Sequence, residues 1–196
     1  MNFRGHKDKD LGSRGSPILS DVPAVSSNLS ALTLTSDATV VSQYTPSEYE
    51  RTSYYNGIAG DVDHPELIYR SDFLTTPFPK PVGRYAYIPV KSLRGVFATP
   101  LNGVWDTVGP EILKLINAQK IKWSALNLAR FFTDGPPGEE EKGSLGPVVI
   151  WVGVIPGSIS SDTAHEVSQE ILTLLLNNGV ENVVVEWREA DFPQRL

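Results

Sequence analysis

A hydroxyl-rich turn is the first place where the residue types could do chemistry together. It runs from Ile155 to Thr163 and leads into a predicted helix. Backbone amides at a helix N-terminus attract anions, and neighbouring hydroxyls could add hydrogen bonds. The candidate anion-binding residues are Gly157, Ser158, Ser160, Ser161 and Thr163. Asp162 would repel an anion, however, and helix capping by Ser161 and Thr163 is the favoured interpretation of the same residues.

His165 follows this turn and is the candidate catalytic residue. Glu166 is next to it and Asp162 is three positions before it, so a carboxylate could orient the imidazole as a general base. Covalent catalysis also needs a paired nucleophile, and no spacing in the sequence identifies one. A solvated histidine on a helix surface is therefore the favoured interpretation.

A second polar stretch places three carboxylates and an imidazole within the segment 61–66. Asp61, Asp63, His64 and Glu66 carry oxygen and nitrogen donors that could bind a divalent cation. The segment lacks the regular alternation and the distal glutamate of a calcium-binding hand. A polar turn before Leu67 is favoured, and we expect no metal or other cofactor.

Two further groups of residues could contact a protein partner. Glu139, Glu140 and Glu141 lie in a loop rich in glycine and proline, so an exposed acidic surface is expected there. Trp187 and Arg188 could mark an interface if they are exposed near the end of the chain. The alternative is that Trp187 is a core or sheet-face residue.

The composition excludes several classes of chemistry. Without cysteine the chain has no disulfide, no thiolate nucleophile and no cysteine-ligated metal. Residues 1–80 hold 7 basic and 10 acidic side chains, and residues 81–196 hold 10 and 13, so neither part has the basic surplus of a nucleic-acid-binding protein. The charged N-terminus and the lack of a long apolar run predict an intracellular protein, cytoplasmic or nuclear, without membrane contact.

The composition along the chain predicts four parts. Residues 1–66 are rich in serine and threonine and are expected to form a disordered tail. Residues 67–84 are expected to be an extended arm packed on a compact α/β domain at 85–190, and residues 191–196 form the C-terminal end.

Hydrophobic periodicity indicates the elements of this domain. We expect a helix that begins near Pro110 and ends at Lys120, then an extended run over Trp123–Phe132. Pro147–Ile155 is apolar on both alternating faces, which predicts a strand buried on both sides. Thr163 and Glu166 match a capping box at the start of a second helix, which Asn178 and Gly179 end.

The last strand and the order of elements lead to a fold class. In Glu181–Arg188, Val183, Val185 and Trp187 alternate with Val184, Glu186 and Arg188, so the two sets face opposite sides of a sheet. The order strand, helix, strand, strand, helix, strand favours a ferredoxin-like βαββαβ sandwich with both helices on one face of an antiparallel sheet. A small doubly wound parallel sheet is the alternative.

Four segments of the chain carry a resemblance to other proteins. Pro77–Arg84, Gly103–Pro110, Arg130–Ser144 and Val183–Glu189 resemble a set of uncharacterised proteins from mushroom-forming fungi, over about Tyr69–Ala190. In longer members this region looks like a module ahead of a segment similar to a trypsin-like protease. The resemblance implies a stand-alone or truncated copy of that module, and it supplies no catalytic residues.

These observations support two hypotheses of function. The first is a non-enzymatic module that binds a protein partner or regulates one, which the missing catalytic constellation and the acidic loop favour. The alternative is a hydrolase-type or small-ligand-binding enzyme that uses the turn and helix start from Gly157 to His165. The second hypothesis requires a pocket at that turn, with His165 within hydrogen-bond reach of a hydroxyl.

Overall fold

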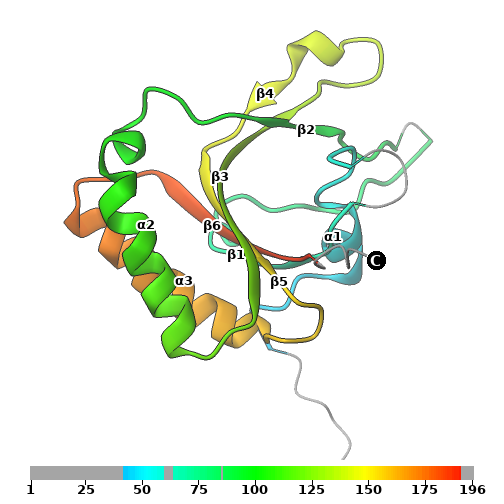
Figure 1. Ribbon diagram of the computed structural model, residues 1–196. Coiled ribbons are helices and arrows are strands. Elements are labelled where there is room, and N and C mark those ends of the chain that lie inside the picture. Colours follow the sequence, from blue (N-terminus) through cyan, green and yellow to red (C-terminus); the bar gives the residue numbers. More distant parts are fainter. Residues whose placement is uncertain (1–41, 60–63, 85, 191–196) are drawn as a thin grey trace, which may run out of the picture. The chain divides into compact units, whose positions relative to one another are not determined.

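The computed structural model describes residues 42–59, 64–84 and 86–190, and these form a mixed α/β domain (Figure 1). The class predicted from the sequence is therefore confirmed. The elements are α1 (Glu48–Ser53), β1 (Leu67–Arg70), β2 (Lys91–Arg94), α2 (Pro100–Ala118), β3 (Trp123–Thr133), the short 3-10 helix η1 (Glu140–Lys142), β4 (Ser144–Leu145), β5 (Val148–Val154), α3 (Ser161–Asn177) and β6 (Val183–Glu189).

The strands form one sheet in the order β1-β6-β5-β3-β2, with β4 paired to the end of β3. β5 and β6 run parallel, and the other pairs are antiparallel. The two strands that α3 joins are direct neighbours, whereas a split βαβ unit would have another strand between them. The order of elements along the chain is compatible with both arrangements, which is why it could not distinguish them. A single parallel pair also differs from a doubly wound parallel sheet.

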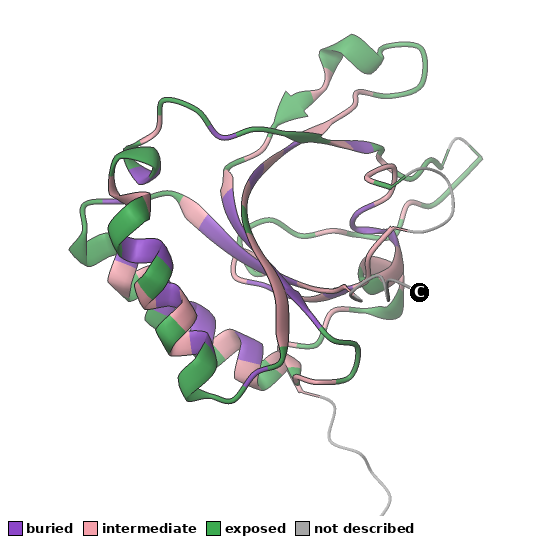
Figure 2. Ribbon diagram, in the orientation of Figure 1, coloured by how far each residue is buried: buried purple, intermediate pink, exposed green. Residues whose placement is uncertain are grey.

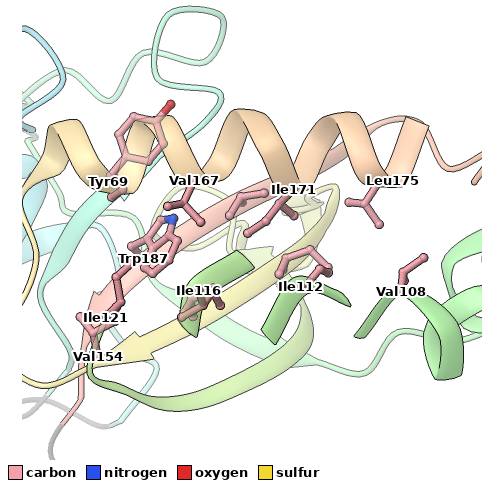
Figure 3. Close-up of a cluster of buried hydrophobic side chains, with 14 of the residues drawn as sticks. Tyr69, Val108, Ile112, Ile116, Ile121, Val154, Val167, Ile171, Leu175 and Trp187 are labelled. Atoms are coloured by element: carbon pink, nitrogen blue, oxygen red, sulfur yellow. The ribbon is translucent and has the colours of Figure 1, made fainter. Parts of the chain in front are cut away.

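Helices α2 and α3 pack together on one face of the sheet, as predicted (Figure 1). The side chains between them and the sheet form the larger core, and Figure 3 shows Trp187 of β6 beneath Val167 and Ile171 of α3. Buried residues follow the inner sides of both helices and the length of β5 and β6 (Figure 2). The predicted alternation of β6 and the burial of β5 on both sides are confirmed.

Both long helices begin earlier than the sequence indicated. α2 starts at Pro100 with Thr99 as its N-cap, so Pro110 lies inside the helix rather than near its start. Pro110 is exposed, and the carbonyl that its missing amide leaves unbonded can therefore bind water. α3 starts at Ser161, and the Ser160 hydroxyl accepts the hydrogen bond from the Thr163 amide. The predicted Thr163–Glu166 capping box is therefore wrong.

The N-terminal limit of the fold also differs from the prediction. Within the segment assigned to the tail, residues 42–59 contain α1 and two buried tyrosines, Tyr54 and Tyr55. These rings pack with Leu67 and other residues on the second face of the sheet, which offsets the entropy of ordering the segment. The start of the predicted arm is strand β1. Residues 1–41 and 191–196 lie outside the described residues.

Gly57 allows the chain after α1 to lie against β2. Its φ is +89°, and an added Cβ would lie 2.6 Å from Val90 Cγ1 and 2.9 Å from the Lys91 carbonyl oxygen. Gly138 has a φ of +87° and no atom within 4 Å of such a Cβ. We expect Gly57→Ala to lower the free energy of unfolding by about 2–4 kcal/mol and Gly138→Ala by about 1 kcal/mol in urea denaturation. Equal losses in the two variants would contradict a close packing of Gly57 on β2.

Candidate ligand-binding site

A buried carboxylate marks the second face of the sheet, opposite α2 and α3. Glu186 lies in the middle of β6, in an otherwise apolar run, and is 2% exposed. The strand alternation that directs Trp187 into the larger core directs Glu186 to the other side. There the Tyr54 and Tyr55 hydroxyls each donate a hydrogen bond of 2.8 Å to its two oxygens. The carboxylate is thus held by two side chains of the segment that follows α1.

A buried cation on β1 lies in the same region and has partners of its own. The Arg70 guanidinium bonds Glu50 at 2.7 Å and Asp72 at 2.8 Å, and it also donates to the Thr76 carbonyl oxygen. Two carboxylates therefore neutralise Arg70. Its charge is not available to a further anion.

Lys91, the first residue of β2, is the second buried cation, and its environment differs from that of Arg70. The residue is 7% exposed, and Nζ lies 3.1 Å from the centroid of the Tyr54 ring. The rings of Tyr55, Phe78 and Phe131 lie 5.7 to 5.9 Å from the same nitrogen. In the described part of the chain, Lys91 Nζ makes no hydrogen bond and no ion pair. Four aromatic rings therefore lie around this ammonium group.

Burial changes the protonation of this cluster. Desolvation lowers the pKa of the Lys91 amine to about 8, and the nearby Glu186 charge only partly opposes that change. Desolvation also raises the pKa of the Glu186 carboxyl, although Lys91 and the two tyrosine hydroxyls act in the opposite direction. Both groups are therefore less inclined to carry a charge than they would be in water.

Lys91 and Glu186 line one cavity of about 270 Å³. More of its surface is apolar than polar, and six polar or charged residues also line it. The lining residues include Tyr54, Phe78, Pro89, Phe131, Pro147 and Val149 on the apolar side, with Asp72, Thr76, Lys91, Thr133, Ser144 and Glu186 as the polar groups. A concave, largely apolar site with converging polar groups is the usual form of a small-molecule site, and the volume of this one lies just below the usual range.

The charges around the cavity limit the ligands that it can hold. Glu50, Arg70, Asp72, Lys91 and Glu186 sum to −1 when all are ionised and to zero when Glu186 is protonated. No positive surplus is therefore present, in spite of the two buried cations. An anionic ligand would meet Asp72 and Glu186, whereas an uncharged ligand avoids that repulsion.

The lowered pKa of Lys91 predicts how stability changes with pH. Since the pKa is about 8 in the folded state and 10.5 ordinarily, the folded state binds fewer protons between those values and the free energy of unfolding rises with pH. From about pH 7 to about pH 9.5 we expect wild type to gain about 2 kcal/mol relative to Lys91→Met, measured by urea denaturation. A difference that is constant over this range would contradict the buried, unpartnered amine.

His165 lies apart from this cavity, on the side of the sheet that the long helices cover. Its ring stacks on Tyr44 with 3.8 Å between ring centroids, and Nδ1 lies 2.8 Å from the Tyr69 hydroxyl. A hydroxyl is thus within reach, but it belongs to a phenol whose pKa burial raises to about 12. The imidazole packs between two side chains of its own chain, which gives His165 a structural role.

The candidate anion site is occupied by acceptors of the chain itself. The Gly157 amide donates to Glu189, the Ser161 hydroxyl to the Ile68 carbonyl oxygen, and the Thr163 amide to Ser160. Asp162 accepts from the Ser42 hydroxyl. The Ser158 side-chain oxygen is buried without a described partner. The structure therefore brings the predicted residues together but uses most of their donors internally.

The remaining candidates are dispersed. Asp61 and Asp63 lie outside the described residues, His64 bonds the Thr52 carbonyl oxygen, and Glu66 pairs with Arg51. Trp187 is fully buried and donates to the Ser168 hydroxyl, so it offers no exposed interface. Arg188 is partly buried, with its guanidinium 3.9 Å from the Trp151 ring centroid. Glu139, Glu140 and Glu141 are exposed, as expected of the acidic loop.

Known proteins provide no match for this chain. Comparisons with family models, with curated proteins and with solved structures each find nothing that matches. Of the helices in the described part, none has the length and apolar character that a membrane span requires. A function can therefore be inferred only from the side chains of the protein itself.

Sequence reasoning did not select Lys91 or Glu186. The available signals were a carboxylate inside an apolar strand and the adjacent pair Tyr54-Tyr55 in a segment that was expected to be disordered. The alternation of side chains along the strand places this glutamate on the same sheet face as a valine. If that face is buried, the carboxylate needs a hydrogen-bond or ionic partner. That requirement could have identified Glu186, but not the residues that satisfy it.

Proposed function

We propose that this domain binds a small, uncharged molecule in the Lys91 cavity. The apolar part of the ligand lies against Phe78, Phe131 and Val149, and a carbonyl or similar oxygen accepts a hydrogen bond from the Lys91 ammonium. The observation that carries the proposal is a lysine amine, almost fully buried and on the wall of a cavity, to which the described chain supplies no acceptor.

The energies favour this role over a purely structural one. Burial of an ammonium ion costs several kcal/mol, whereas a cation–π contact returns about 0.5–2 kcal/mol. The lowered pKa of Lys91 reflects the same deficit, because burial outweighs the attraction of the nearby carboxylates. A ligand oxygen at Nζ would supply the missing hydrogen bond. Residues that cost stability in this way are typical of binding sites.

One of the two hypotheses drawn from the sequence was small-ligand binding. The proposed function keeps small-ligand binding but moves it to a different site. Small-ligand binding was assigned there to the Gly157–His165 turn, whose donors are largely used by the chain. The protein-interaction hypothesis stays a prediction that depends on the exposed Glu139–Glu141 segment.

A ligand-observed NMR screen of the full chain tests the proposal. The library holds matched neutral, anionic and cationic fragments, and the variants are Ser144→Phe, Lys91→Met and Lys122→Met. Ser144 is exposed on β4 and lines the cavity, so a phenyl ring there fills the site without altering the buried cluster. Lys122 is an exposed lysine that does not line the cavity.

We expect neutral carbonyl-bearing fragments to bind wild type and Lys122→Met equally. Ser144→Phe and Lys91→Met should each lose about tenfold or more in affinity, which corresponds to about 1.4 kcal/mol. Binding that persists in Ser144→Phe, or a preference for anionic fragments, would refute the proposed site.

A further inference from the structure

We infer that Lys91 condenses with the carbonyl group of an aldehyde or ketone held in this cavity, so that the ligand is bound reversibly as an imine. The inference rests on the proposed function, because it names the ligand class and the bond for the same cavity. It depends on the placement of a buried primary amine, a carboxyl group and an apolar wall around one space.

The amine is available for attack in two respects. Nζ makes no hydrogen bond to a described residue, so no acceptor must be displaced before its lone pair reaches a ligand carbon. With a pKa of about 8, roughly one Lys91 side chain in ten is neutral at pH 7, compared with about one in three thousand for an ordinary lysine. A desolvated lysine in an apolar pocket is a usual form of an activated amine nucleophile.

The step is balanced within the cavity. The neutral Nζ attacks the carbonyl carbon and forms a C–N bond, and a proton moves from nitrogen to oxygen to give a carbinolamine. The C–O bond then breaks, the hydroxyl leaves as water with an added proton, and the nitrogen loses its remaining proton as the C=N bond forms. The carbonyl oxygen thus takes up both protons of the amine and leaves as one molecule of water. Nothing is oxidised or reduced.

The charges favour a carbonyl ligand over an anionic one. A carboxylate would place a third negative group beside Asp72 and Glu186, while the Arg70 charge is already matched by Glu50 and Asp72. An aldehyde or ketone brings no charge into the site. Its ring or alkyl part also suits the aromatic faces of Phe78 and Phe131.

Other lysines of the described chain provide an internal control. Lys80, Lys114, Lys120, Lys122 and Lys142 are all exposed, in contrast to Lys91. Lys114 lines the open groove between α2 and α3, where its ammonium group is paired with Glu111, and none of the five lines the Lys91 cavity. Selective reaction at Lys91 would therefore result from its cavity and not from the general reactivity of lysine amines.

The experiment uses benzaldehyde and sodium cyanoborohydride at about pH 7 with the folded full chain. The reductant converts an imine into a stable benzyl amine, which peptide mass spectrometry locates. We expect the adduct on Lys91 to exceed that on each exposed lysine by about tenfold or more, and to fall to their level in Ser144→Phe. Even labelling of all lysines would overturn the inference.

Binding of benzaldehyde itself separates the inference from the proposed function. If NMR shows that benzaldehyde binds wild type but not Ser144→Phe, and no adduct forms on Lys91, the imine is refuted and the proposed site stands. If neither binding nor an adduct is observed with benzaldehyde or with the neutral fragments, both are refuted.

Discussion

Replacement of Glu186 by alanine is expected to lower the free energy of unfolding by about 3–5 kcal/mol. The variant leaves the Tyr54 and Tyr55 hydroxyls without their acceptor, and it removes the carboxylate whose attraction opposes the desolvation of Lys91. Each buried group that loses its partner costs about 1–3 kcal/mol, so the losses accumulate. Urea denaturation of the two proteins measures the difference.

Glu186→Gln is the matched control for this prediction. The amide keeps the size of the side chain and one acceptor oxygen, so one of the two tyrosine hydrogen bonds is retained. We expect a loss of about 1–2 kcal/mol, less than half of that in Glu186→Ala. Equal losses in the two variants would show that the hydrogen bonds to Glu186 contribute little.

Trp187→Ala is expected to have a similar effect from the opposite face of the same strand. The indole is fully buried between β6 and α3 (Figure 3). Its Nε1 donates to the Ser168 hydroxyl at 2.8 Å. Removal of a buried tryptophan leaves a cavity and costs about 3–5 kcal/mol. Differential scanning calorimetry would show the loss as a lower melting temperature.

Trp105→Ala tests whether burial, and not residue type, determines this effect. Trp105 lies on α2 and is only partly buried at the edge of the larger core. We expect it to cost less than half as much as Trp187→Ala, because less apolar surface leaves water at that position. A larger loss from Trp105→Ala would contradict the arrangement of the core.

The regular parts of the fold could be predicted because their side chains report burial directly. The run from Pro147 to Ile155 is apolar on both faces, and it is the central strand β5. The alternation around Trp187 likewise gave the two faces of β6. Strand order depends on contacts between distant segments, and periodicity within one segment carries no information about them.

The misplaced start of α2 has a local cause. Proline is favoured in the first turn of a helix, and that preference pointed to Pro110. Pro100 occupies that position instead, after Thr99, and the structure accommodates Pro110 on the exposed side of the same helix. Both prolines have the same local preference for the first turn of a helix. The sequence does not show which of them begins the helix, because that depends on which turns pack against the core.

The candidate site could be predicted only in part. The sequence assigned Glu186 and Trp187 to opposite faces, which is the arrangement observed. It did not indicate that Tyr54 and Tyr55 bond Glu186, or that the Lys91 side chain lies among aromatic rings, because these contacts join the segment after α1 with β2 and β6. The hydroxyl-rich turn was a stronger local pattern, but Ser160 caps the helix, and Gly157 and Ser161 donate to other parts of the chain.

Chemical-shift mapping of a bound neutral fragment is the most direct test of the central claim. Amide spectra of the full chain are recorded with increasing amounts of the tightest carbonyl-bearing fragment from the screen. We predict shifts confined to residues that line the cavity, including Thr76, Lys91, Phe131 and Ser144, and their loss in Ser144→Phe. Shifts confined to the groove between α2 and α3, around Leu115 and Leu174, would contradict a ligand site at Lys91.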